Sequence, residues 1–235
     1  MTSTSRIFQS ALVALANLEA IRAVVSNEDL VAYPYFAELM QTAGSGLDWK
    51  SYKATSSDGY ITNLWRITGE NSTASRDAPL GPVLLTHGMY SDGTGWMERT
   101  DTVAAAFPVQ LHNLGYDVWI ANSRGTETSL GHTLYDWNTQ PEYFDYCFDE
   151  MGNDVVAQID TIIAARVGET CSPVQLVTHS SGSSAAIIAA IKDASMQEKM
   201  ARIVTMSPCY FMNMDAIEIN LKEPASTAYF FDLLE

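Results

Sequence analysis

The residues with the clearest chemical meaning lie around position 180. Val174 to Thr178 is a short, apolar, β-rich run; Ser180 follows it closely, and the small residues from Ser183 to Ile191 favour a helix. A sharp turn between a buried strand and a helix lifts a serine hydroxyl out of a sheet and brings the helix N-terminus beside it. This pattern predicts that Ser180 is the nucleophile of an acyl-transfer reaction.

A serine hydroxyl attacks a carbonyl group only if donors hold the negative charge that develops on the oxygen. The backbone N–H of Ser181, at the start of the predicted helix, is the first expected donor. The second should come from a loop after an earlier strand, and Thr86-His87-Gly88-Met89 follows the apolar run at Val83 in this way. We assign this second role to the backbone N–H of Met89.

One position departs from the usual G-x-S-x-G pattern of such turns. Thr178 stands where the first glycine is expected, whereas Gly182 is present. We expect the branched side chain of Thr178 to crowd Gly182 and to strain or tilt the turn. The alternative interpretation is that residues 180–184 are only a serine-rich N-terminal cap of an ordinary helix.

The histidines raise a difficulty for a complete catalytic triad. All four, His87, His112, His132 and His179, precede or adjoin the serine, whereas hydrolases with this turn present serine, acid and histidine in that order. Either the chain is incomplete, or it is not catalytic in the usual way. We expect His87 to shape its loop and His179 to pack beside the nucleophile rather than to act as the base.

Composition excludes several classes of partner. A formal charge of −15 with only 13 Lys and Arg argues against nucleic acid. The three cysteines lack metal-ligand spacing, so we expect no metal and assign them to burial as small apolar groups. Residues 91–95 lack a nucleotide-binding pattern, and no cofactor is expected. Several acidic residues at near-helical spacing predict a solvated helical face: Asp145, Asp149, Glu150, Asp154 and Asp160.

The coarse pattern along the chain predicts an α/β fold. Residues 26–43 form a helix broken near Pro34, and a β-hairpin joins 49–54 to 60–67. Short apolar runs then alternate with helix-period segments, which is typical of a mostly parallel sheet with helices on both faces. The predicted strands are Val83 to Thr86, Tyr116 to Ala121, Val174 to Thr178 and Ile203 to Ser207; the predicted helices are Thr102 to Leu114, Glu150 to Arg166 and Ser183 to Met200.

The first residues allow two interpretations. Residues 1–25 are either a signal peptide, with Ala14-Leu15-Ala16 as a cleavage site, or an N-terminal amphipathic helix. The triplet Asn71-Ser72-Thr73 is a glycosylation acceptor of the kind found in secreted proteins. No apolar stretch approaches the roughly 20 residues that span a bilayer, so no transmembrane segment is expected. The location is therefore predicted as secreted or lysosome-like, otherwise cytoplasmic.

Four blocks in order resemble the acid lipase family, which includes the lysosomal acid and gastric lipases. They are Asp58-Gly59-Tyr60-Ile61 with Arg66-Ile67; Pro82 to Met89 with Trp96; Leu114 to Gly125 with His132; and Phe148-Asp149-Glu150-Met151 with Asp154 and Ile159-Asp160. The resemblance implies an α/β-hydrolase fold, Ser180 as nucleophile, and the N–H groups of Met89 and Ser181 as oxyanion donors. It also implies a lipid ester substrate, a triglyceride or steryl ester, and no cofactor.

The resemblance also divides the chain. Residues 26–207 correspond to a hydrolase core without its last strands, and 208–235 to the start of a cap that would contact a lipid surface. The triad acid and histidine have no counterpart, since Asp215 and Asp232 fall where a cap begins. The chain alone is therefore expected to hydrolyse esters poorly, with an uncovered sheet edge after residue 207. The alternative is a non-catalytic lipid-binding or interaction protein that keeps a degenerate hydrolase fold.

Overall fold

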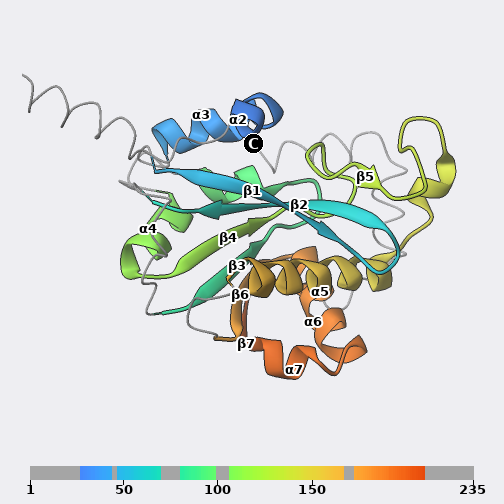
Figure 1. The fold of residues 1–235 in the computed structure, drawn as a ribbon. Coiled ribbons are helices and arrows are strands. Elements are labelled where there is room, and N and C mark those ends of the chain that lie inside the picture. Colours follow the sequence, from blue (N-terminus) through green and yellow to red (C-terminus); the bar gives the residue numbers. More distant parts are fainter. Residues whose placement is uncertain (1–26, 44–46, 70–79, 99–105, 167–171, 210–235) are drawn as a thin grey trace, which may run out of the picture.

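The structure is a computed structural model that describes residues 27–43, 47–69, 80–98, 106–166 and 172–209 (Figure 1). Several predictions fall outside these residues: the two interpretations of 1–25, the glycosylation triplet at 71–73, Cys171, and all of the proposed cap except Pro208 and Cys209. Within the described part of the chain, no helix is both long and apolar enough to cross a membrane.

A single mixed sheet forms the centre of the molecule, with strand order β1-β2-β4-β3-β6-β7. The first three strands in this order pair antiparallel, and β4, β3, β6 and β7 pair parallel. The strands are β1 (Trp49–Thr55), β2 (Tyr60–Ile67), β3 (Pro82–Thr86), β4 (Asp117–Ala121), β6 (Val174–His179) and β7 (Met200–Met206); the short β5 (Gly131–His132) pairs with β2. The predicted hairpin leading into a mostly parallel sheet is therefore confirmed.

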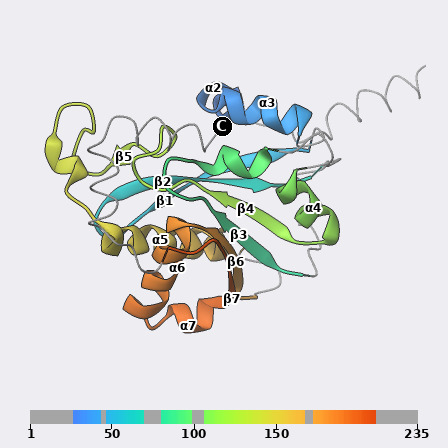
Figure 2. The same cartoon turned by 180° about the vertical axis from the view of Figure 1, so that it is seen from behind.

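Helices cover both faces of the sheet (Figures 1 and 2). One face carries α3 (Pro34–Thr42), α4 (Phe107–Leu114) and the 3-10 helix η1 (Gly93–Met97); the other carries α5 (Phe148–Ala165) and α6 (Ser181–Lys192). Pro34 occupies the first turn of α3 and separates it from α2 (Asn27–Ala32), as predicted, because proline lacks the N–H that a continuous helix would need.

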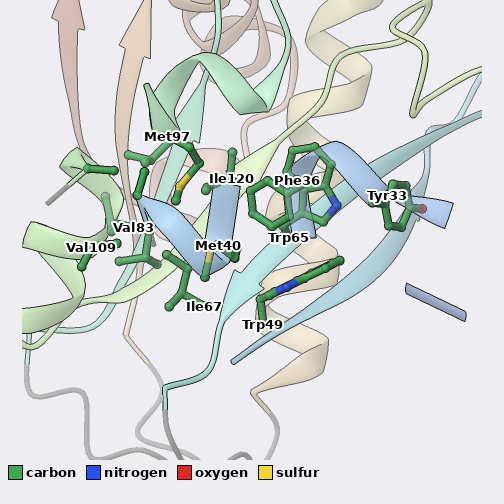
Figure 3. Close-up of a cluster of buried hydrophobic side chains, with 14 residues drawn as sticks. Tyr33, Phe36, Met40, Trp49, Trp65, Ile67, Val83, Met97, Val109 and Ile120 are labelled. Carbon is green, nitrogen blue, oxygen red and sulfur yellow. The ribbon is translucent and has the colours of Figure 1, made fainter. Parts of the chain in front are cut away.

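The central strands are buried on both faces because alternate side chains enter two separate cores. In β3, Val83 and Leu85 join the core beneath α3 and α4, whereas Leu84 joins the core beneath α5 and α6. Figure 3 shows the first core, in which Phe36 stacks on Trp65 with ring centroids 3.8 Å apart. This double burial fixes the ends of β3 and β6, from which the candidate site is built.

The predicted helix from 183 to 200 is wrong in its second half. The chain leaves α6 at Asp193, which has an extended backbone, and resumes in the short helix α7 (Met196–Lys199). The carboxylate of Asp193 accepts a hydrogen bond from the backbone N–H of Ser195 at 2.9 Å. A local bond of this kind competes with the helical ladder and ends the helix.

Strand β7 is the last strand in the order of the described sheet. Its apolar side chains Val204 and Met206 are exposed, in contrast to the buried residues of β3 and β4. Within the described residues, β7 therefore borders the sheet and exposes two apolar side chains.

Candidate active site

Ser180 occupies the turn between β6 and α6 with a strained backbone. Its φ of 48° and ψ of −120° lie in a region that residues with a Cβ rarely adopt. The surroundings enforce this conformation, because the Ser180 N–H donates to the carbonyl of Met206 at 3.0 Å and its own carbonyl accepts from Ser183 N–H at 3.0 Å. The serine is half-buried. The sequence therefore folds here into the sharp strand-to-helix turn that the pattern predicted.

Two glycines bring the loop after β3 against this turn. A Cβ added at Gly88 would lie 2.9 Å from the Ser180 Cβ, and one added at Gly182 would lie 2.4 Å from the carbonyl oxygen of His87. Both separations are far below an ordinary contact, so each position is closed to any larger residue. The predicted oxyanion loop and the serine turn are consequently in direct contact.

The two predicted oxyanion donors border the same pocket. Met89 and Ser181 both line a cavity of about 820 Å³ that lies beside the turn. Neither backbone N–H donates a hydrogen bond to another residue in the described parts of the chain. For Ser181 this is expected, since the first N–H groups of a helix have no partner within it.

Thr178 does not crowd Gly182 as expected. Its hydroxyl shares a hydrogen bond of 2.8 Å with the Ser183 hydroxyl and donates to the Val204 carbonyl at 3.3 Å. The three atoms nearest to a Cβ on Gly182 belong to Thr86 and His87 instead. The larger residue at 178 is therefore matched by a small polar partner one helical position after the glycine.

His87 shapes its loop, and its hydrogen bonds fix its tautomer. The backbone N–H of Ser123 donates to His87 Nε2 at 3.0 Å, so this nitrogen carries no proton. Nδ1 must then carry the proton and donate to the carbonyl of Gly88 at 2.8 Å. Burial lowers the pKa of the His87 imidazole, which favours this neutral form. Because Nε2 is occupied, His87 is not placed to take a proton from Ser180.

The described contact of the Ser180 hydroxyl is with a cysteine that the sequence patterns did not single out. Ser180 Oγ lies 3.4 Å from Cys209 Sγ, and the Ser184 hydroxyl donates to the Cys209 carbonyl. No histidine ring bonds to Ser180 Oγ among the residues that the structure describes. Parallel strands end at the same edge of a sheet, so a residue just after β7 reaching the turn after β6 could have been anticipated.

Arg124 forms the structural support of the pocket wall. Its side chain is fully buried and bonds to Asp58 through Nη1 at 2.7 Å and to Asp154 through Nη2 at 2.7 Å. The guanidinium also lies over the ring of Tyr60, 3.8 Å from its centroid, and near that of Tyr146. Arg124 is therefore a buried anchor for the carboxylate of Asp154.

Arg124 and Asp58 stabilise each other's charge, whereas burial raises the pKa of Asp154 despite its bonds to Arg124. Burial alone would lower the pKa of Arg124, but the bonds to Asp154 and Asp58 outweigh it and raise that pKa. Burial would likewise raise the pKa of Asp58, yet the bonds from Arg124 and Ser56 lower it. The ion pairs join the hairpin turn, the loop after β4 and helix α5. These are parts of three of the four blocks that carry the family resemblance.

Two expectations about individual residues are wrong. Asp154 does not belong to a solvated helical face, because it is buried against Arg124, whereas Asp160 is exposed and pairs with Lys199. Cys147 is exposed at the start of α5 rather than buried, and Cys209 is partly buried. Helical spacing alone does not reveal which carboxylate faces a cation from another segment.

Sequence comparison gives the same family as the motif blocks. Residues 39–100 match the family model described as a partial alpha/beta-hydrolase lipase region. Lipase member K of Homo sapiens is 32% identical over 164 residues, which cover 69% of this chain and 40% of that protein. The chain is similar in sequence to acid lipases over part of their length. Gastric triacylglycerol lipase of Bos taurus, at 30% identity, and a putative lysosomal acid lipase/cholesteryl ester hydrolase of Crotalus adamanteus, at 29%, match over the same shares of the two chains.

Solved structures confirm the α/β-hydrolase fold of this chain. An esterase from Pyrococcus furiosus superposes with a TM-score of 0.53 at 18% identity, over 88% of this chain and 63% of that one. A carboxylesterase from Bacillus subtilis gives a TM-score of 0.51 at 12% identity, over 84% of this chain and 56% of the other. The chain spans 40% of the length of the curated lipases that it matches.

Proposed function

We propose that this chain carries the nucleophile and the oxyanion donors of a serine hydrolase that acts on lipid carboxylic esters. The observation that supports it most is the strained backbone of Ser180 at the β6–α6 turn. Strain of this kind persists only where the surroundings enforce it, and it is typical of functional sites. The names of the related lipases favour triglyceride or steryl esters as the substrate.

In the proposed reaction, Ser180 Oγ attacks the ester carbonyl carbon and its proton passes to a base. The carbonyl oxygen becomes an oxyanion, which the backbone N–H groups of Met89 and Ser181 receive. The bond to the alcohol oxygen then breaks, the alcohol leaves with a proton, and water releases the acid from the acyl-enzyme. The four histidines do not supply the base in the described geometry, since none bonds to Ser180 Oγ there.

The test is the reactivity of Ser180. In a form of the protein that also supplies the base, a fluorophosphonate probe should label Ser180, and Ser180→Ala should abolish both labelling and hydrolysis of a chromogenic ester. Thr126→Ala changes another residue that lines the same pocket and is a control that should keep labelling. Labelling at another serine, or an ester hydrolysis that survives Ser180→Ala, would contradict the proposal.

The second candidate is a non-catalytic lipid-binding protein. The favouring observation is the contact of Ser180 Oγ with Cys209, in a site where no described histidine reaches that hydroxyl. A serine without an activating base does not react readily. Lipid binding without any fluorophosphonate labelling would favour this candidate over the hydrolase.

The related gastric and lysosomal lipases lead us to place the protein in a secreted or lysosome-like compartment. Their names give no support to a cytoplasmic location. Detection of the tagged protein in medium or in lysosomal fractions tests this placement.

A further inference from the structure

The segment between β5 and α5, residues 133–145, exposes large apolar side chains. We name it the aromatic loop; Figure 1 shows it projecting beside β5. Its exposed fractions are 76% for Leu134, 44% for Trp137 and 55% for Phe144. Apolar side chains gathered on one exposed segment mark an interaction site more often than single scattered ones do. The predicted lipid contact through residues 208–235 belongs to another part of the chain, of which only Pro208 and Cys209 are described.

Hydrogen bonds hold the tip of the loop in one conformation. The backbone N–H of Asp136 donates to the side chain of Gln140 at 2.7 Å, and the N–H of Gln140 returns to the Asp136 carbonyl at 2.9 Å. Asn138 N–H donates to the Asp136 carboxylate at 2.9 Å. Trp137 therefore stands on a closed turn, and its exposure follows from the fold of the loop.

The base of the loop is fixed by stacked rings. His132 Nδ1 accepts from the N–H groups of Leu134 and Tyr135 at 2.9 and 3.0 Å. The Tyr135 ring stacks on His132 with centroids 4.7 Å apart, and the buried ring of Tyr143 contacts Phe144 at 4.9 Å. The exposed residues thus rest on a rigid platform, which reduces the entropy that binding would cost.

The loop is connected directly to the pocket. Glu127, shortly before it, and Tyr146, immediately after it, both line the cavity beside the serine turn. The base of the aromatic loop therefore adjoins the pocket into which, under the proposed function, an ester must pass.

The charge of the segment selects the kind of surface. Residues 125–150 contain no lysine or arginine and carry the acidic residues Glu127, Asp136, Glu142, Asp145, Asp149 and Glu150. An anionic lipid surface would repel such a segment, whereas a neutral or zwitterionic surface would not.

We propose that the aromatic loop docks this protein on neutral lipid surfaces by inserting Leu134 and Trp137. The role rests on the proposed function, because the surface would carry the ester substrate. Tryptophan suits the boundary between lipid and water, since its ring is largely apolar and its N–H stays hydrated.

The test measures partition of the protein onto phosphatidylcholine-coated triolein droplets by flotation. The double variant Leu134→Ser with Trp137→Ser should partition about ten-fold more weakly or worse, because withdrawing one large apolar side chain already costs that much. The matched control is Val31→Ser with Tyr35→Ser, two exposed apolar residues of α2 and α3 with exposed fractions of 81% and 55%. It should bind as the original protein does.

Fluorescence identifies the inserted residue. Binding should shift the emission of Trp137 to the blue, and Trp137→Phe should keep the binding while losing this shift. At low salt, the protein should bind more weakly to triolein droplets coated with phosphatidylglycerol than to those coated with phosphatidylcholine. The proposal would be overturned if the double variant bound droplets as well as the original protein, or if the control pair lost as much binding as the double variant. Stronger binding to the anionic droplets than to the phosphatidylcholine droplets would also overturn it. A dimer that dissociates in the double variant would assign the loop to a second copy instead.

The measurement separates this proposal from the proposed function. Ser180→Ala should bind droplets as the original protein does, because Ser180 is not part of the aromatic loop. Failure of fluorophosphonate labelling with normal droplet binding would reject the hydrolase and keep the docking surface.

Discussion

Replacing Gly182 by alanine should disrupt the contact between the serine turn and the loop after β3. The added methyl would lie 2.4 Å from the His87 carbonyl oxygen and 2.7 Å from Thr86 Oγ1. One of these is backbone, and Thr86 is buried at the end of a central strand. Neither neighbour can give way by rotating an exposed side chain, so the loop or the helix must move.

The size of the movement follows from contact distances. Carbon and oxygen normally approach to about 3.3 Å, so the His87 carbonyl must withdraw by about 0.9 Å from its present 2.4 Å. Overpacking of this kind costs about 1–3 kcal/mol in the free energy of unfolding. In a chain of this length each kcal/mol lowers the melting temperature by about 2–4 °C. The same shift displaces the Met89 amide, and an error of about 1 Å in a reactive site can cost about 100-fold in rate.

Urea and thermal unfolding of Gly182→Ala and Gly95→Ala give the comparison. At Gly95 the one atom within 4 Å of an added methyl is the exposed Ser91 hydroxyl, which can rotate away. We therefore expect Gly95→Ala to leave the free energy of unfolding nearly unchanged and Gly182→Ala to lower it. If Gly182→Ala melts at the original temperature and reacts with fluorophosphonate at the original rate, the contact does not set the geometry of the site.

Three further changes test other parts of the site. Ser180→Gly should raise the free energy of unfolding by about 1–3 kcal/mol, because glycine tolerates the positive φ, and it should abolish fluorophosphonate labelling. A lower stability in urea unfolding would contradict the backbone strain at this position. Arg124→Met should lower the free energy of unfolding by about 3–5 kcal/mol, because Asp154 stays buried without its cation. Lys199→Met removes the cation of an exposed pair and should lower it by only about 0–1 kcal/mol. Equal losses of stability in the two variants would contradict this reasoning. Since the pKa of His87 is lowered from 6.5, the folded state binds fewer protons there than the unfolded state, so stability should fall as pH drops below 6.5. Melting temperatures between pH 7 and 5 should show this fall, and it should be smaller in His87→Asn; an identical slope in that variant would assign it to other groups.

The strands and the serine turn could be predicted because both depend on local sequence. The apolar runs at β3, β4 and β6 have the length and composition of doubly buried strands, and their bounds agree with the structure to within one residue. The order serine, small residue, glycine before an alanine-rich segment was enough to place Ser180 at a turn. Its backbone strain was not predictable, because it comes from bonds to Met206 and Ser183 made after folding.

The long-range contacts could not be predicted from spacing. The acidic neighbours of Asp154 on its helix predict a solvated face, yet its partner Arg124 lies 30 residues away on another element. The end of α6 at Asp193 depends on a side-chain bond that helix propensity does not register. Cys209 lacked any motif, and only the adjacency of β6 and β7 brings it to Ser180.

The position of Arg124 has a consequence for how ligands of different size could be accommodated. Its guanidinium links the wall of the pocket to the hairpin turn and to α5 through ion pairs. Moving that wall outward would break these ion pairs and leave a buried cation beside the ring of Tyr60 without a carboxylate. The unbranched thioethers of Met89 and Met151 line the same cavity and can change rotamer at little cost, which suits them to such adaptation. Under the proposed function, the range of acyl chains accepted would then depend on these two methionine side chains more than on the backbone.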